Sequence, residues 1–414
     1  MNLLFSIIAI VLSAPFPLLL QGQEEETSND PAATPSTPAD QANWQAITSA
    51  KNGPWGDLEY FPVALDCPVE LLPLLSIPSL KTEWIFPAAN REELNAILHQ
   101  SDLPSDKISA ILYGSTIVQT QDYSRIYPTD ETILNMPIEA RQKFYSLLSR
   151  FPENKFFYRP LYIGSDNLSR WFQGTEIPRQ TISDISKLAY PTPSGVGYFL
   201  SDLAYALKGA SDSIEERAVY QGLLRRRALI VRLRLTEGTD ITQIAKYWTA
   251  GYKNKSVLPF LESAVSADSG GAIDVAHLLP ATPRQYVNRF PDLANGITGR
   301  YPDWFWTCYN FFRFSPRDVY ADSGERANLM DREFDLALPP YEYGDMIVFN
   351  SGGRAIHGCI YIAEDIVFTK NGSDMFTPWC LMKIQDVVAY HDIKGDITLT
   401  LFRKRPLPPT VPAQ

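Results

Sequence analysis

Residues 345–404 consist mainly of short β-rich runs, and this pattern constrains the fold more than any other feature of the sequence. Glycine, aspartate and lysine residues separate the runs, as the turns of a small antiparallel sheet require. Two helix-like segments precede the runs, at 304–312 and 323–334. The predicted strands are DMIVFN, AIHGCIYIA, DIVFTKN, DVVAYHD and DITLTLFRK. The sequence therefore predicts an α+β domain at 296–405, in which a helix packs on an antiparallel sheet.

The preceding region, residues 55–290, begins with a proline-rich and irregular stretch at 55–90. From there to about residue 290, helix signals dominate. Asn90 and Glu93 have capping-box spacing at the start of one predicted helix. The segment SIEERAVYQGLLRRRALIVRLRL (213–235) is predicted to be a single helix, and its basic run is interpreted as a solvated face. The other predicted helices are 137–151, 240–251 and 255–267. Residues 55–290 are thus predicted to form an α-rich domain of unknown role.

The N-terminus carries an apolar run, MNLLFSIIAIVLSAPFPLLLQGQ, which is typical of an export signal. Pro15 and Pro17 disfavour a stable spanning helix, so residues 1–22 are predicted to be a signal-like leader. If the leader is not removed, residues 1–20 are expected to associate with a membrane. Residues 23–50 are rich in proline, threonine and acid, and are predicted to be a disordered spacer. These features predict an exported protein of the periplasm or cell envelope.

Charge and cysteine content narrow the classes of partner. The formal net charge of −10 argues against a nucleic-acid partner. No pair of ligands has the spacing of a zinc site, so neither a metal nor a cofactor is predicted. Four cysteines in 414 residues do not make a disulfide framework. Whether Cys359 or Cys380 forms a bridge stays open, as does the oligomeric state.

One of the cysteines, Cys308, lies in the aromatic segment WFWTCYNFF. A cysteine nucleophile needs a lowered pKa, an imidazole base and a third group that orients the ring. Pro302 and Asp303 indicate a helix start just before Cys308, where free N–H groups and the helix dipole favour a thiolate. Taken alone, however, a cysteine among aromatic side chains is more often a small buried apolar group.

His357 is the candidate base, because it begins the predicted strand HGCIYIA. Side chains alternate along a strand, so His357, Cys359 and Tyr361 share one face. The next predicted strand offers Thr369 and Asn371 on one face as candidate groups to orient the ring. The lysine between them is expected to face away.

The Cys308 helix, the run GDMIVF (344–349) and the strand HGCIYI (357–362) together resemble the NlpC-type bacterial cell-wall cysteine peptidases. The resemblance covers residues 296–405. It implies a papain-like fold, in which an antiparallel sheet packs on the helix of the nucleophile. It also implies that Cys308 is the nucleophile and His357 its base.

The same resemblance places the third polar residue of the family at Thr369, with Asn371 as the chemical alternative. It suggests that Tyr301 orients the substrate or the oxyanion, as tyrosines do in the family. The sequence departs from the family beside the cysteine, where Thr307 and Tyr309 replace the usual Asp and Ser. Those positions help to recognise wall peptides in the family, so the substrate is in doubt.

The sequence supports two hypotheses about function. The first is an exported thiol hydrolase that cleaves an amide or peptide bond of a cell-envelope substrate. In that mechanism His357 takes the proton of Cys308, the thiolate attacks the carbonyl, and the backbone N–H of Cys308 stabilises the oxyanion. The second is a catalytically inactive envelope binding or scaffold protein built on the same fold.

Overall fold

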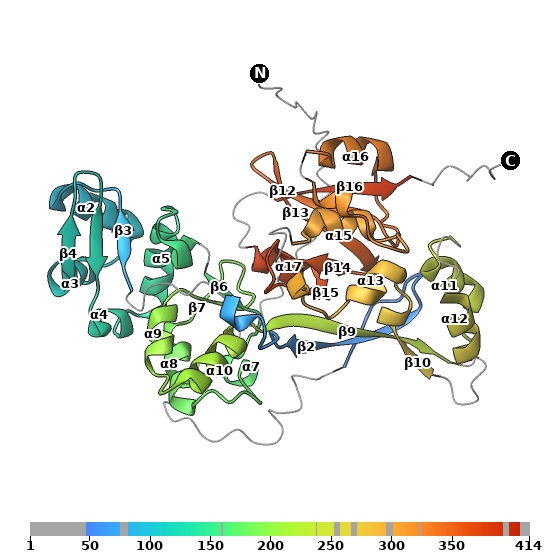
Figure 1. Ribbon diagram of the computed structural model, residues 1–414, viewed down its shortest axis with the longest axis horizontal. Coiled ribbons are helices and arrows are strands. Elements are labelled where there is room, and N and C mark those ends of the chain that lie inside the picture. Colours follow the sequence, from blue (N-terminus) through green and yellow to red (C-terminus); the bar gives the residue numbers. More distant parts are fainter. Residues whose placement is uncertain are drawn as a thin grey trace. The chain divides into compact units, whose positions relative to one another are not determined.

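The computed structural model describes most of the chain from residue 47 to residue 405 (Figure 1). The described ranges are 47–74, 82–158, 160–236, 238–251, 257–265, 271–294, 301–322, 324–391 and 397–405. The predicted leader and residues 23–46 of the predicted spacer lie outside them. The last residues of that spacer differ from the prediction, because β1 (Thr48–Ser49) pairs with β2 (Asp57–Leu65). The architecture is mixed α+β, and its sheets are antiparallel.

A six-stranded antiparallel sheet forms the C-terminal part, in the order β11-β16-β12-β13-β14-β15. The strands are β11 (Phe334–Ala337), β12 (Met346–Ser351), β13 (Arg354–Ala363), β14 (Ile366–Lys370), β15 (Trp379–Lys383) and β16 (Thr398–Lys404). Strands β12, β13, β14 and β16 confirm four of the five predicted strands. The fifth prediction, at 386–392, is wrong, because this segment belongs to the helix α17 (Ile384–Tyr390). Ile384, Val387 and Val388 have helical spacing and pack into one core.

Strands β11 and β15 are absent from the sequence prediction. Strand β15 is buried along its whole length, so the sequence WCLMK shows no alternation of apolar and polar residues. Strand β11 follows directly on α16 (Arg326–Glu333), a helix that the sequence predicted. The two middle residues of β11, Asp335 and Leu336, are both exposed. Neither strand therefore carries the period-two pattern on which the prediction rested.

Helices cover both faces of this sheet. The helix α15 (Trp304–Asn310) packs on one face, and α17 packs on the other (Figure 1). The core on the α15 side includes Met346, Val348, Ile360, Ile362 and Phe368. The core on the α17 side includes Ile347, Phe349, Cys359, Tyr361 and Val367. The pleat of the strands thus divides neighbouring residues between two separate cores.

The region predicted to be α-rich contains helices and also three antiparallel sheets. The helices are α2 (Arg91–Leu98), α3 (Ser105–Gly114), α4 (Asp130–Leu134), α5 (Ile138–Leu148), α6 (Lys155–Tyr158), α7 (Leu168–Trp171), α8 (Arg179–Leu188), α9 (Leu203–Lys208), α10 (Ser213–Leu223), α11 (Ile241–Trp248), α12 (Leu258–Val265) and α13 (Ala281–Tyr286). The sheets have the orders β1-β2-β9-β10, β3-β5-β4 and β6-β8-β7. Their further strands are β3 (Trp84–Phe86), β4 (Thr116–Gln119), β5 (Ser124–Tyr127), β6 (Leu161–Ile163), β7 (Tyr190–Pro191), β8 (Tyr198–Leu200), β9 (Arg226–Leu235) and β10 (Gly271–Asp274). Strand β2 therefore lies in the stretch that was expected to be irregular.

Residues 226–234 of the basic run are part of the strand β9, so the prediction of one helix over 213–235 is wrong. Helix α10 ends at Leu223, and β9 pairs with β2 from Leu65↔Arg226 to Asp57↔Arg234. The residues VRLRL alternate with period two, and Val231, Leu233 and Leu235 of β9 are buried in the core. That alternation indicates a strand with one buried face. Arg232 and Arg234 lie on its other face.

The helix caps follow the sequence closely. Asn90 accepts a hydrogen bond from the N–H of Glu93 at 2.9 Å, as the capping box predicts. Asp212 caps helix α10, since its carboxylate accepts from the N–H groups of Ile214 and Glu215. In the described part of the chain, no helix combines the length and the apolar character needed to cross a membrane.

One core connects the two predicted domains. The cluster on the α15 face of the six-stranded sheet also includes Leu58 of β2, Leu229 of β9 and Trp248 of α11. Packing is therefore continuous across the predicted boundary between residues 290 and 296. By contacts, all described residues belong to one unit.

Candidate functional site

Cys308 is a buried residue in the middle of α15. The carboxylate of Asp303 caps this helix by accepting from the N–H of Trp306 at 3.1 Å, and it also pairs with Arg326 at 2.7 Å. The N–H groups of the first turn of a helix are left free. Cys308 is the fifth residue of α15 and lies beyond that turn. Its N–H is therefore not available as an oxyanion donor. The side chain is 1% exposed, and burial raises the pKa of the thiol well above its usual value, so the thiol stays neutral.

His357 begins a chain of buried hydrogen bonds on β13 and β14. Its Nε2 lies 2.8 Å from the hydroxyl of Thr369, which donates to Oδ1 of Asn371 at 2.8 Å. Because the one hydroxyl proton of Thr369 is used in this way, Nε2 of His357 carries a proton and donates it. The two candidate ring orienters are thus both present, with Thr369 in direct contact and Asn371 behind it. Lys370 points away, as expected, and its ammonium donates to the carbonyl of Gly372.

His391 is the partner of His357 that the sequence analysis missed. Its ring centroid lies 4.2 Å from that of His357, and its Nε2 is buried without a hydrogen-bond partner. Burial lowers the pKa of His391 to about 4. Burial, and secondarily the proximity of His391, holds the pKa of His357 well below its usual value. Two neutral imidazoles therefore lie together on the α17 side of the sheet, with His357 buried and His391 partly exposed.

Cys308 and His357 lie on opposite faces of the sheet. Next to His357 on β13, Gly358 faces α15, and an added Cβ there would lie 2.5 Å from the Trp304 ring. Cys308 belongs to the core on the α15 side, whereas Cys359, which shares the face of His357, belongs to the other core. No hydrogen bond joins the Cys308 thiol to His357 in the described part of the chain. In this structure the Cys308 thiol and the His357 ring therefore face different cores.

The physical reason for this arrangement is a steric one. Trp304 is a large ring at the start of α15, and it needs a gap in the sheet surface if the helix is to pack closely. Gly358 provides that gap because it has no Cβ. Once Gly358 faces the helix, strand alternation turns its neighbour His357 to the other face.

The two tyrosines suggested for substrate binding have structural contacts instead. Tyr309 is buried, and its hydroxyl donates to the carbonyl of Arg326 at 3.2 Å, which fixes α16 to α15. Tyr301 is half-buried and packs against the core of the preceding region, in the cluster that includes Tyr162 and Tyr190. Cys308 belongs to a different cluster. The Tyr309 hydroxyl is thus held by α16, and Tyr301 packs in a different core from Cys308.

The other groups that could carry chemistry form neither a disulfide nor a metal site in the described part of the chain. All four cysteines are free and buried, so no disulfide joins Cys308 to Cys359. Across the described ranges, no three histidine, cysteine, aspartate or glutamate side chains gather as a metal site would require. His391, which sequence reasoning missed, is brought beside His357 by tertiary packing, which leaves no local pattern in the sequence.

No protein-family model matches the chain, and no curated protein or solved structure matches it either. The resemblance to the cell-wall peptidases therefore rests on the motifs around Cys308 and His357 alone.

Replacing His391 by phenylalanine is expected to flatten the pH dependence of stability between about pH 4 and 6.5. In that window the unfolded chain binds a proton at this histidine and the folded chain does not, since its folded pKa is about 4. The free energy of unfolding of the wild type should therefore fall as the pH falls, by up to about 1.4 kcal/mol per pH unit from this group. Denaturant unfolding over this pH range measures the slope.

The matched control for this experiment is His99→Phe, which changes an exposed histidine. It is expected to keep the wild-type slope. The slope that remains in His391→Phe is the sum of the other buried groups, with His357 acting in the same direction as His391 and Asp202, whose pKa burial raises to about 6, acting in the opposite direction. An unchanged slope in His391→Phe would contradict the burial of two neutral imidazoles at this place.

Proposed function

We propose that this chain is a catalytically inactive binding or scaffold protein of the bacterial cell envelope. The observation that carries the proposal is the separation of Cys308 from His357 by strand β13. A thiol hydrolase needs its base within reach of the thiol, about 3 Å or one water away. Here the thiol faces apolar side chains, and the imidazole faces Thr369 and His391.

The protonation states of the two groups support the same conclusion. Burial raises the pKa of the Cys308 thiol and lowers the pKa of the His357 imidazole. A catalytic cysteine shows the opposite pattern, because a thiolate and an imidazolium stabilise each other. In this protein both groups are neutral, and the aromatic residues around Cys308 serve packing.

We further propose that the domain is a papain-like fold of the NlpC type that has lost its catalytic arrangement. The order of elements supports this proposal, since α15 is followed by β12, β13 and β14, which pair antiparallel in sequence order. The motif GD before β12 and the histidine in β13 are also in the order of that family. The domain would differ from that family in the face of β13 on which the histidine lies.

The thiol hydrolase remains the second candidate, and one observation favours it. The hydrogen-bonded series His357, Thr369 and Asn371 has the order expected for a base with its orienting groups. Such a function would require α15 or β13 to change its packing so that the thiol reaches the imidazole.

Two measurements test the proposed function. Purified protein is incubated with bacterial cell-wall peptides, and the products are analysed by mass spectrometry. We expect no turnover by the wild type, by Cys308→Ser or by the control Cys359→Ser. Turnover that is lost in Cys308→Ser and kept in Cys359→Ser would establish the hydrolase instead.

Binding is measured by co-sedimentation with cell-wall sacculi. We expect the wild type and Cys308→Ser to sediment equally, because the thiol takes no part in recognition. Failure of the wild type to sediment would contradict the proposal that the chain binds the envelope.

A further inference from the structure

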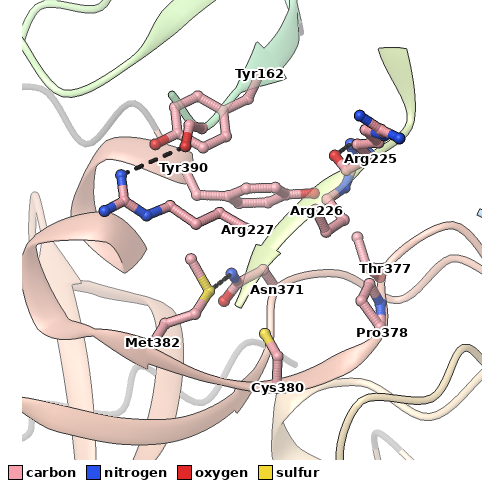
Figure 2. Close-up of a pocket in the computed structure, with 11 residues that line it drawn as sticks. Tyr162, Arg225, Arg226, Arg227, Asn371, Thr377, Pro378, Cys380, Met382 and Tyr390 are labelled. Carbon is pink, nitrogen blue, oxygen red and sulfur yellow. Dashed lines mark hydrogen bonds between the residues drawn. The ribbon is translucent and has the colours of Figure 1, made fainter. Parts of the chain in front are cut away.

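A small cavity lies where β6, β9 and α17 approach the loop after β14 (Figure 2). Its lining includes Tyr162, Arg226, Arg227, Asn371 and Tyr390. In the view of Figure 2, Tyr390 and Arg227 lie between Tyr162 and Asn371. The cavity has a volume of about 10 Å³, which is the room needed by one water-sized particle.

Three consecutive arginines line this cavity, and two of them have an acidic partner. Nε of Arg225 lies 2.5 Å from the carboxylate of Asp66, and Nε of Arg227 lies 3.7 Å from that of Asp386. Each of these pairs is neutral as a whole. Within the described ranges, Arg226 has no such ion pair, so the lining carries one uncompensated positive charge.

The contacts of Arg226 leave donors unused. One terminal nitrogen donates to the carbonyl of Arg225 at 2.9 Å, and the guanidinium also hydrogen-bonds the side chain of Tyr390, whose ring centroid lies 5.8 Å away. The Nε–H of Arg226 is buried and has no acceptor. A buried donor of a charged group without an acceptor is costly, so its presence beside a cavity indicates that the acceptor is a bound particle.

Asn371 adds a neutral donor to the same lining. Its Oδ1 accepts from Thr369, and its Nδ2 donates one hydrogen to the sulfur of Met382 at 3.0 Å. An amide nitrogen has two hydrogens, and a thioether is only a weak acceptor. The side chain therefore has capacity left to donate toward the cavity.

We propose that this cavity binds one small monovalent anion of about the size of chloride, held by the Nε–H of Arg226 with Asn371. One uncompensated charge selects a single negative charge, and the size of the cavity excludes sulfate, phosphate and carboxylate groups. The ion is enclosed by elements from both predicted domains. Its binding therefore stabilises the contact between β6 and β9 on one side and β14 and α17 on the other.

The first test compares thermal unfolding in chloride and in gluconate at equal ionic strength. Because an ion that binds only the folded state stabilises it, we expect the midpoint in chloride to be higher by at least about 2 °C. Arg226→Gln is expected to lose this difference. Arg289→Gln, which changes an exposed arginine outside the cavity, is expected to keep it.

The second test locates the ion and does not depend on a variant that folds. Crystals of the native protein grown in sodium bromide are measured at the bromine absorption edge. We expect an anomalous peak in the cavity within hydrogen-bonding distance of Nε of Arg226. A water molecule there without an anomalous peak, or an equal chloride effect in Arg226→Gln, would overturn the proposal.

Discussion

Cys308 in the native protein is expected to react with iodoacetamide at least about a thousandfold more slowly than in the unfolded chain. The reagent attacks a thiolate, and the thiol of Cys308 is 1% exposed with a pKa raised by burial. Reaction then requires the structure to open. For a domain with about 5 kcal/mol of stability, the open fraction is on the order of 10⁻⁴.

Mass spectrometry of the digested protein measures this reaction separately at each cysteine. The other three cysteines provide internal controls, since they are free and no more than 2% exposed. We expect all four to label slowly together in the native protein and rapidly in denaturant. Fast and selective labelling of Cys308, with a pH midpoint below that of a free thiol, would show an activated nucleophile and contradict the account.

Much of the C-terminal sheet could be predicted from the sequence, because period-two alternation and turn residues are local signals. The alternation of HGCIYIA places His357 and Cys359 on one face, and Ile360 and Ile362 on the other, as the two cores confirm. The contact between His357 and Thr369 follows from the same pattern.

The face on which α15 packs could not be predicted in this way. Alternation says which residues share a face, but it does not say which face a helix covers. That choice depends on the fit of Trp304 against Gly358, a contact between residues 54 positions apart (358 − 304 = 54). The resemblance to a peptidase family implied that α15 covers the face of the sheet that carries His357. The steric fit of Trp304 against Gly358 places α15 on the opposite face.

The basic run of β9 was misread for a related reason. Arg225, Arg226 and Arg227 follow a capped helix, and the nearby Gly222 lies inside α10 and not after its last residue, so no glycine or proline follows Leu223 to end the helix there. Pairing with β2 decides the conformation, and β2 lies about 170 residues earlier in the chain. The cavity beside Arg226 is likewise formed only when distant segments meet.

The packing of α15 on the Gly358 face is the central claim, and a Gly358→Ala substitution is expected to have a large effect on stability. A Cβ at this position would lie 2.5 Å from the ring of Trp304, which is closer than real contacts allow. Trp304 cannot withdraw easily, because its ring stacks on Phe305 with centroids 3.6 Å apart. Overpacking of this kind costs about 2–3 kcal/mol.

Gly271→Ala is the matched control, because Gly271 is also a strand glycine and no atom lies within 4 Å of its Cβ position. It is expected to change the free energy of unfolding by less than about 1 kcal/mol. Gly358 and Gly271 both have ordinary backbone conformations, so the difference between the two substitutions measures the contact with the helix.

The most direct measurement is a double-mutant cycle between Gly358→Ala and Trp304→Ala, followed by denaturant unfolding. If the helix packs on this face, Gly358→Ala should cost about 2–3 kcal/mol with Trp304 present and less than about 1 kcal/mol without it. That coupling is the result the account predicts. An equal cost of Gly358→Ala in both backgrounds would show that α15 does not cover this face, and would return Cys308 to the side of His357.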